Sequence, residues 1–151
     1  MYSIKTTIAL FNKSGFKISP KDIAAIIKAA RAAFSLKTRN DEINIILVKD
    51  AEIKRLNKKF LKKDRATDVI TFNYPHDTPC APGEKRPYGD VYICADQAKR
   101  QAKAYGMSLL SELIILAVHG TLHLQGYEDY KTRDRVRMSL KTVQILKKLT
   151  F

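Results

Sequence analysis

The sequence predicts an α+β fold, and three observations lead to this class. Short runs rich in β-branched residues lie before residue 95, whereas almost all of the chain after it has helical periodicity. Strands that gather early and helices that gather late favour an α+β fold over a doubly wound sheet. A chain of 151 residues also fits one domain, so we expect residues 1–151 to form a single unit with about four strands.

The first half of the chain is expected to alternate strands and helices. Residues 3–12 combine β-branched residues with rough alternation, which predicts a strand. Ser19 and Pro20 are typical of an N-cap and a first helical residue, and KDIAAIIKAARAAF then carries one apolar stripe. A second strand is expected at residues 42–48, and Asp50 is expected to cap a helix over AEIKRLNKKFL.

Two further strands, residues 67–74 and 89–95, are expected to flank a long loop. The intervening PHDTPCAPGEKRP holds four of the chain's five prolines, so it is too long and proline-rich for a tight hairpin. We expect a mobile surface loop of the kind that often serves binding.

From Ala95 the chain is expected to be helical to its end. One helix ends at Gly106, and Ser108 is expected to cap the next, which runs through LLSELIILAVHGTLHLQ and stops near Gly126. A last helix covers KTRDRVRMSLKTVQILKKL. The apolar residues that it is expected to bury include Val136, Met138, Leu140, Val143 and Leu146.

Composition limits the class of protein. Twenty-eight Lys and Arg against fifteen Asp and Glu give a net charge of +13, which predicts a polyanionic partner, although a solvated lysine-rich surface is the alternative. The two cysteines form no C-x-x-C pair, so a zinc knuckle or redox motif is not expected and a reduced, cytoplasmic protein fits best. We expect no secretory signal, because the first residues lack its apolar core. We also expect no segment that spans a membrane, because the longest apolar run, LIILAV, is too short.

Two histidines four residues apart form the most informative pattern. His119 and His123 lie on the expected helix, so their Cβ atoms would stand about 5–6 Å apart on one face. Two imidazoles so placed can bind one metal ion, whereas one packed and one surface histidine is the alternative. Gly120 between them suggests that the helix backbone packs closely against a neighbour.

A metal site needs a third protein ligand, and the segment after the helix offers two acids. Gly126 can take a left-handed conformation and turn the chain back toward the histidines. Asp129 and Glu128 are therefore the candidate third ligands, with a turn carboxylate in solvent as the alternative for Asp129. His76, the third histidine, would have to reach the site from the long loop.

These residues carry a resemblance to a known family. HGTLHLQGYED resembles the signature H-G-x-L-H-L-x-G-Y-D-H of the YbeY family of bacterial endoribonucleases. LNKKFLKKDRATDVITF resembles the family's L-N-x-x-Y-R-x-K-D-x-P-T-D-V-L-S-F segment, and YGDVYI resembles its G-D-I-x-I strand. The three blocks keep the family's order and spacing, so the resemblance covers nearly the whole chain.

The resemblance implies a zincin-like α+β fold with a small mixed sheet and a metal site on a helix and the turn after it. It implies a metal-dependent, single-strand-specific endoribonuclease that acts in 16S rRNA 3′-end maturation and ribosome quality control, with a metal-activated water attacking the phosphodiester. The implied partners are single-stranded RNA, 16S rRNA and the small ribosomal subunit. The family's metal, usually zinc, is held by three histidines, so His119 and His123 would be the first two ligands.

Two positions depart from the family pattern. Asp129 stands at the position of the family's third histidine, and a His₂Asp site is chemically sound. Its extra negative charge would weaken Zn²⁺ as a Lewis acid. The oxygen ligand could also shift the metal preference toward Mn²⁺ or Mg²⁺. Leu61 stands where the family has an arginine near the phosphate. Lys62, Lys63 or Arg65 could replace that charge only from displaced positions. Packing in the core is the better interpretation of Leu61.

Other residues have two alternative interpretations each or a candidate role in catalysis. Asp68 could orient a ligand histidine by a hydrogen bond or simply cap its strand. Glu112 is a speculative general base, as is whichever of the two acids after Gly126 does not bind the metal. Three basic runs near the histidines indicate a groove for an RNA backbone, although a solvated helix face explains any one of them. The residues expected to bind RNA are Lys58, Lys59, Lys62, Lys63, Arg65, Lys99, Arg100 and Lys103.

Two alternatives to a nuclease are open. The departures at Leu61 and Asp129 would also suit a ribosome-associated RNA-binding factor with little or no nuclease activity. The helix-borne histidine pair would suit a metalloprotease, but Gly120 stands where H-E-x-x-H places its general-base glutamate.

Overall fold

A four-stranded mixed sheet organises the computed structural model, which describes residues 6–35, 41–63 and 67–149. The strand order is β1-β2-β4-β3, in which β1 (Thr7–Asn12), β2 (Asp41–Val48) and β4 (Arg86–Cys94) run parallel. The edge strand β3 (Val69–Asn73) pairs antiparallel with β4. The predicted α+β class is confirmed, and the mixed sheet is the one that the family resemblance implied.

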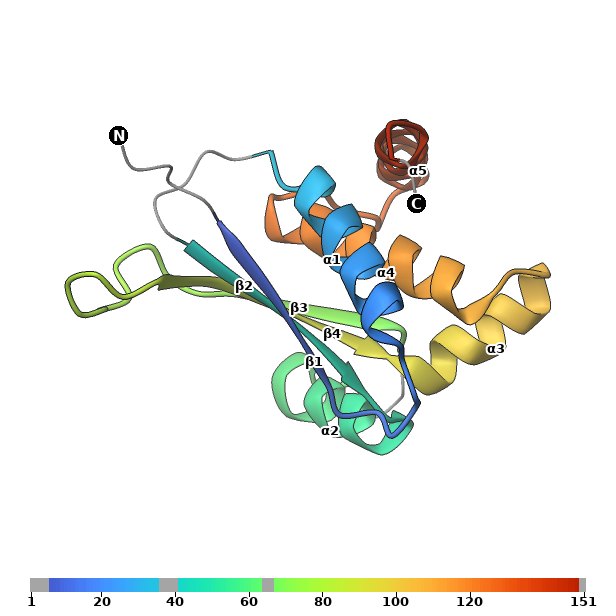
Figure 1. The fold of residues 1–151 in the computed structure, drawn as a ribbon, viewed down its shortest axis with the longest axis horizontal. Coiled ribbons are helices and arrows are strands. Elements are labelled where there is room, and N and C mark those ends of the chain that lie inside the picture. Colours follow the sequence, from blue (N-terminus) through green and yellow to red (C-terminus); the bar gives the residue numbers. More distant parts are fainter. Residues whose placement is uncertain (1–5, 36–40, 64–66, 150–151) are drawn as a thin grey trace.

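Helices cover the two faces of the sheet unequally (Figure 1). α1 (Pro20–Ala33) and α4 (Leu109–Leu124) pack on one face, and α5 (Thr132–Lys147) lies on these two helices. α2 (Asp50–Leu61) lies on the opposite face, while α3 (Ala95–Tyr105) leads from the end of β4 to α4. The sheet therefore has one fully covered face and one face that a single helix covers in part.

The sequence of β2 explains its central place. Ile43, Ile45 and Leu47 alternate toward α1 and α4, whereas Ile46 and Val48 point toward α2, and all five are buried. The last four residues of β2, 45–48, are all apolar, which is what a strand covered on both faces needs.

The predicted helix ends agree with the structure in most places. The Ser19 and Ser108 hydroxyls accept hydrogen bonds from the backbone N–H groups of the first turns of α1 and α4. Gly106 ends α3 in the left-handed conformation, with φ of 68°. The cap expected from Asp50 is wrong: Lys49 occupies the N-cap, and Asp50 is the first residue of α2.

Two other expectations are corrected. β4 begins at Arg86, three residues before the predicted start at Gly89, because the chain already pairs with β2 there. On α5 only Met138 of the expected residues is fully buried; Val136, Leu140 and Val143 are 52%, 66% and 50% exposed. This helix packs on α1 and α4 through one side, so its second apolar stripe faces solvent.

The long loop of residues 74–85 projects from the sheet, as expected for a surface loop (Figure 1). At its base, the Arg86 guanidinium donates two hydrogen bonds to the carboxylate of Asp41, which is fully buried. A third hydrogen bond from Arg86 reaches the backbone carbonyl of His76.

In the described ranges no single helix is long and apolar enough to cross a membrane. Taken together, α3 and α4 have the required length and composition, but the pair is bent by 116°.

Candidate metal centre

A cavity of about 310 Å³ opens at the β3 edge of the sheet, between α2 and α4. Four separate segments form its walls: the end of α2, strand β3 with the residues before it, the second half of α4 and the turn after α4. His119, His123, Asp129 and Asp68 all line it. The fold thus gathers in one place both helix histidines and two of the carboxylates that the sequence singles out, and we call this space the histidine cavity.

The close approach of α4 to the sheet depends on Gly120. A Cβ atom at this position would stand 2.3 Å from Cγ1 of Val91 and 3.4 Å from Cγ1 of Val69. The helix backbone therefore lies directly on β4 and β3, as the glycine predicts. This contact carries the neighbouring His119 to the edge of the sheet.

His123 is oriented by the turn that follows α4. Its Nδ1 lies 2.9 Å from the backbone carbonyl oxygen of Tyr127. Because a carbonyl oxygen can only accept, Nδ1 carries the proton and Nε2 of the neutral ring keeps its lone pair. Gly126 has φ of +97°, and the Tyr127 N–H bonds back to the Leu122 carbonyl, which fixes this turn. Histidines that bind metals are typically held in this way.

The spacing of His123 and Asp129 suits two ligands of one ion. Nε2 of His123 lies 3.5 Å from Oδ2 of Asp129. Two ligands each about 2.1 Å from a tetrahedral ion would stand about 3.4 Å apart. Burial lowers the pKa of His119, as does the neighbouring His123, while Asp68 and Asp129 oppose the shift. A lowered pKa keeps the imidazole neutral, which is the form that binds a metal.

The three candidate ligands are not equally close. The described residues contain one group of three or more His, Cys, Asp or Glu whose ligand atoms all lie within 4.8 Å of one another, and it does not include His119. Closing His119, His123 and Asp129 around one ion therefore needs a side-chain rotation. Asp129 has the freedom to make it, because its side chain is 50% exposed.

The close group consists of Asp50, Cys94 and Asp96, and the sequence analysis did not find it. Burial is the main cause that raises the pKa of the Cys94 thiol to about 11, so the thiol stays protonated. The Asp50 carboxylate accepts two hydrogen bonds from Arg100, and Asp96 accepts one from the backbone N–H of Asp50. These donors already hold α2 and α3 together, so we assign the group a structural role.

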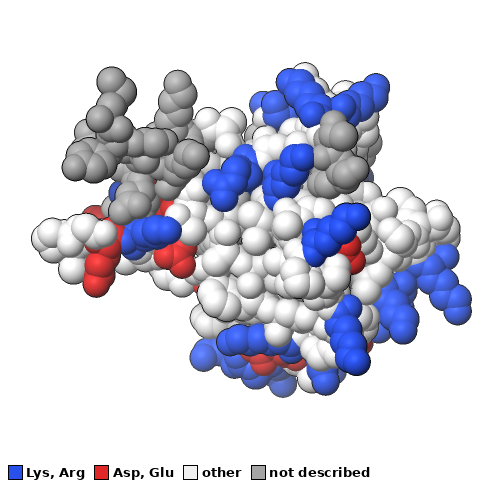
Figure 2. All heavy atoms as spheres, viewed as in Figure 1, with Lys and Arg blue, Asp and Glu red and all other residues white. Residues whose placement is uncertain are grey.

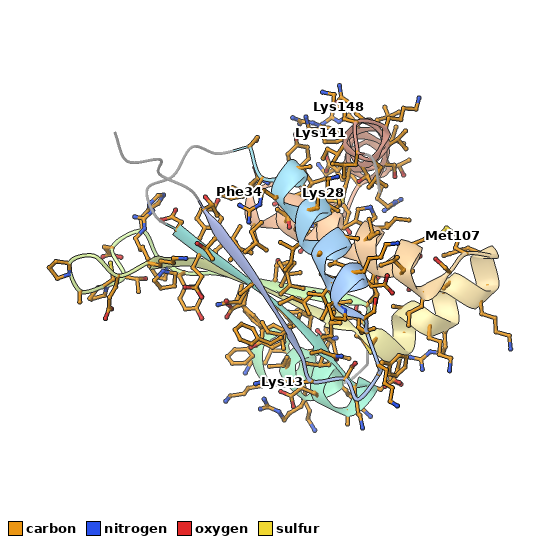
Figure 3. All side chains as sticks on the ribbon, viewed as in Figure 1. Lys13, Lys28, Phe34, Met107, Lys141 and Lys148 are labelled. Carbon is orange, nitrogen blue, oxygen red and sulfur yellow. The ribbon has the colours of Figure 1, made fainter. Side chains whose placement is uncertain are left out.

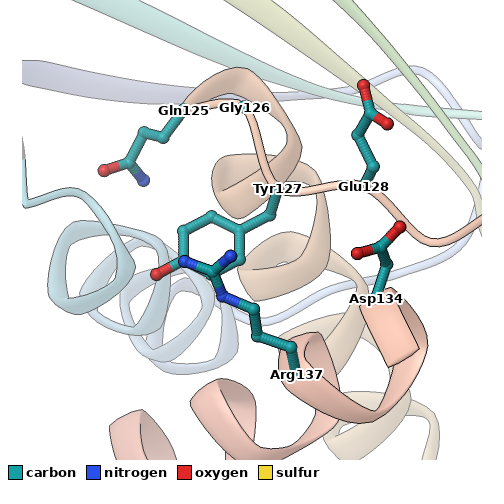
Figure 4. Close-up of a pocket in the computed structure, with 6 residues that line it drawn as sticks. All are labelled: Gln125, Gly126, Tyr127, Glu128, Asp134 and Arg137. Carbon is teal, nitrogen blue, oxygen red and sulfur yellow. The ribbon is translucent and has the colours of Figure 1, made fainter.

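The alternatives for the third ligand lie elsewhere. Glu128 lines a separate cavity of about 220 Å³, together with Asp134 and Arg137. Figure 4 shows the Glu128 side chain pointing away from Tyr127, whose ring lies 5.3 Å from the Arg137 guanidinium carbon. His76 lies in the long loop and does not line the histidine cavity.

Asp68 takes the second of the two roles expected for it, that of a cap at the start of its strand, and Glu112 does not line the histidine cavity. Asp68 lines the histidine cavity, but its carboxylate accepts hydrogen bonds from the Val69 N–H and the Thr67 hydroxyl; among the described residues none joins it to a histidine. The Tyr127 carbonyl takes the orienting role instead. Glu112 is buried beside Gln101, which donates a hydrogen bond to it, and lies about 10 Å along α4 from His119.

Leu61 is not a core residue, which corrects the interpretation drawn from its apolar side chain. It is 48% exposed and lines the histidine cavity, as does Lys63. Lys62 ends α2 in a left-handed conformation, with φ of 60°. Arg65 lies outside the described residues.

The other basic residues expected to bind RNA do not line the histidine cavity. Lys58 and Lys59 are exposed on α2. On α3, Arg100 is engaged with Asp50, Lys99 lies over the Phe16 ring, and Lys103 is exposed. On the face that Figure 2 shows, Lys and Arg lie over α2, α3 and α5, and acidic side chains lie near the long loop and among the basic ones over α2.

The sheet and the histidine cavity define a class of protein: an α+β domain with a candidate metal centre between a helix and the sheet edge. The chain belongs to the YbeY family, because the family profile described as Endoribonuclease YbeY matches residues 10–150. This confirms the resemblance seen in the sequence.

Individual relatives support the same assignment. The Endoribonuclease YbeY of Elusimicrobium minutum (strain Pei191) is 42% identical over 123 residues, which cover 82% of this chain and 83% of that protein. The one from Endomicrobium trichonymphae is 36% identical over 134 residues, with 87% and 89% covered. The solution structure of TM1509 from Thermotoga maritima matches with a TM-score of 0.59 and 26% identity, over 95% of this chain and 87% of that one.

Proposed function

We propose that this chain is a metal-dependent endoribonuclease that cleaves single-stranded RNA. One observation supports this most: His123 is held by the Tyr127 carbonyl with its Nε2 close to Asp129, inside a cavity of a YbeY-family chain. We extend the proposal to a role in 16S rRNA 3′-end maturation and ribosome quality control, in the cytoplasm and with the small ribosomal subunit as partner, as the family resemblance implies.

The residues of the histidine cavity suit a divalent ion. His119, His123 and Asp129 would hold it, and the bound ion would supply a Lewis acid for the phosphodiester and lower the pKa of a water. Two imidazoles and one carboxylate suit Zn²⁺, and the oxygen ligand also admits Mn²⁺ or Mg²⁺. The Tyr127 carbonyl fixes the tautomer of His123, and burial keeps His119 neutral.

The chain's own side chains would position the substrate and move the proton. Lys63 lines the histidine cavity and can pair with a phosphate oxygen. Asp68 is the second carboxylate of the described cavity wall, and the Val69 N–H holds it in place. We assign it the role of accepting a proton from the attacking water, because Glu112 lies too far along α4 and is engaged with Gln101.

Cleavage of a labelled single-stranded RNA by the purified protein tests this proposal, with Zn²⁺, Mn²⁺ and Mg²⁺ supplied separately. We expect cleavage with at least one metal, and loss of cleavage with retained RNA binding in His123→Ala. The matched control is His76→Ala, which removes a histidine outside the histidine cavity and should cleave normally. Equal cleavage by His123→Ala and the wild type would refute the proposal.

A second candidate function is an RNA-binding factor with little or no nuclease activity. The position of Leu61 favours it, because an exposed leucine stands at the cavity wall where the family places a cation. Tight RNA binding without cleavage under all three metals would select this candidate.

A further inference from the structure

A second cavity lies on the other flank of α2 from the histidine cavity. It has a volume of about 550 Å³ and forms where the first half of α2 meets β2, β4 and the residue after β1. We infer that it binds one nucleotide of a single-stranded RNA whose neighbouring segment enters the histidine cavity, an inference that rests on the proposed function. We call it the distal nucleotide cavity, lined by Lys13, Ile46, Lys49, Arg55 and Tyr92 among others.

The floor of the distal nucleotide cavity is apolar and contains one aromatic ring. Ile46 and Val48 point from β2 toward α2, and Tyr92 stands next to Ile46 on β4. The Phe72 ring meets Tyr92 edge-on, with 5.8 Å between the ring centroids, so Tyr92 is held in place before a ligand arrives. A base can cover such a floor whatever its sequence, because every base has an apolar face.

The rim of the distal nucleotide cavity is cationic. Lys13 and Lys49 are exposed, and the Lys49 chain lies across Gly15, where a Cβ would stand 3.2 Å from its Cε. The missing Cβ thus makes room for the lysine beside the cavity. The Arg55 guanidinium donates two hydrogen bonds to the Glu52 carboxylate, and Glu52 is the one acid among the described residues that line the cavity. The two lysines are therefore the main partners for an anion.

An aromatic, apolar floor under a cationic rim matches the two halves of a nucleotide. The base or ribose would cover the floor, and the phosphate would meet the lysines. A base must be unpaired to reach the floor, which selects single-stranded RNA over a duplex. A purely acidic peptide would use the rim but would leave Tyr92 uncovered.

Helix α2 connects the two cavities. Its first half contributes Ala51, Glu52 and Arg55 to the distal nucleotide cavity, and its second half contributes Asn57 and Leu61 to the histidine cavity. The two sets stand on the order of 10 Å apart along the helix axis. Lys58 and Lys59, in the second half of α2, are exposed and can contact phosphates of a strand that follows the helix. A strand of a few nucleotides can therefore engage both sites.

The inference is tested by the affinity of a fluorescein-labelled 12-nucleotide single-stranded RNA, measured by fluorescence anisotropy without added metal. We expect the double variant Lys13→Gln/Lys49→Gln to bind the RNA about tenfold more weakly. Because two phosphate contacts are lost, the slope of the logarithm of the binding constant against the logarithm of the salt concentration should become shallower by about 1.4. The control Lys28→Gln/Lys148→Gln removes the same charge from the helical layer on the other face of the sheet, and should leave binding within about twofold of the wild type (Figure 3).

The aromatic floor is tested separately. We expect Tyr92→Leu to weaken binding of the 12-nucleotide RNA about fivefold and Tyr92→Phe to leave it unchanged, since phenylalanine keeps the ring. Neither variant should alter binding of a four-nucleotide RNA that reaches only the histidine cavity. If Tyr92→Leu fails to fold, the lysine pair still decides the question.

The outcomes separate this inference from the proposed function. RNA binding that depends on the two lysines, in a protein that cleaves nothing, supports the distal nucleotide cavity and removes the nuclease proposal. If the protein cleaves RNA normally and the Lys13→Gln/Lys49→Gln variant binds RNA as tightly as the control variant, the inference is overturned. The nuclease proposal then stands. Competition by a poly-glutamate peptide as strong as competition by unlabelled RNA would also overturn the inference.

Discussion

Leu61 ends α2 with nearly half of its surface in solvent and its side chain at the wall of the histidine cavity. A residue placed there can reach a bound phosphate without disturbing the core. Leucine offers only an apolar contact, whereas a guanidinium would offer two parallel hydrogen bonds to phosphate oxygens. The local chemistry of the histidine cavity therefore depends on one side chain that the fold does not require.

Leu61→Arg is expected to increase RNA cleavage. We expect kcat/KM to rise about tenfold, because a charge-assisted hydrogen bond to phosphate is worth about 1.5–3 kcal/mol before solvent exposure reduces it. Leu61→Met is the control, since it keeps an apolar chain of similar size. A Leu61→Arg variant no more active than Leu61→Met would show that position 61 does not face the substrate.

Gly120→Ala is expected to destabilise the protein, because the new methyl group would collide with Val91 on β4. Overpacking of this kind costs about 1–3 kcal/mol, measurable as a lower free energy of unfolding in urea. Val91→Ala removes the opposing branch, so the double variant should lose less than the sum of the two single losses. Strict additivity would contradict the contact.

At the scale of elements, one polar junction joins α2 to α3. Asp50 begins α2, and its carboxylate accepts hydrogen bonds from the Arg100 guanidinium on α3 and from the Cys94 thiol. The bond from Arg100 is the main cause that lowers the pKa of Asp50 below its usual value. A carboxylate in the first turn also interacts favourably with the helix dipole.

Asp50→Asn should lower the free energy of unfolding by about 1 kcal/mol at pH 7, a modest loss because the pair is partly exposed to solvent. The folded-state pKa of Asp50 is depressed, so its contribution is present above the unfolded pKa of about 3.9 and fades as the pH falls through the folded value. Urea unfolding at pH 7 and pH 3 checks this. An equal difference between variant and wild type at both pH values would contradict it.

Local signals made most elements predictable from the sequence. Ser19, Ser108 and Gly106 mark helix ends through short-range backbone chemistry, which one sequence suffices to show. The exposure of Val136 and Leu140 could not be foreseen, because periodicity shows that a helix has an apolar stripe but not which stripe meets the core.

The candidate site was predictable in part for the same reason. His119 and His123 are four residues apart, so local geometry places them together. The Tyr127 carbonyl that orients His123 carries no side-chain signal. The contacts of Asp50 with Cys94 and Arg100 join positions more than forty residues apart, which no local pattern reveals.

At the scale of the whole molecule, the net charge of +13 is unevenly spread. On the face seen in Figure 2, basic side chains outnumber acidic ones over α2, α3 and α5, and acidic ones lie at the long loop. Both cavities that flank α2 include lysines in their walls. A polyanion would therefore be attracted to the α2 side of the sheet and away from the loop.

RNA binding by this molecule should depend strongly on salt. For a single strand that contacts four cations, the logarithm of the binding constant falls against the logarithm of the salt concentration with a slope of about −3. The affinity then falls roughly 50-fold between about 50 and 200 mM salt. Anisotropy titrations of a single-stranded RNA over that range give the slope. A slope near zero would show that the basic surface does not hold the RNA backbone.

The metal content of the purified protein tests the central claim most directly. We predict about one divalent ion per chain in the wild type and in Glu128→Ala, and a large loss in His123→Ala and Asp129→Ala. Asp50→Asn, which alters the other close group of candidate ligands, should keep its ion. Full metal content in Asp129→Ala, or loss of the ion in Asp50→Asn alone, would contradict a metal centre built from His119, His123 and Asp129.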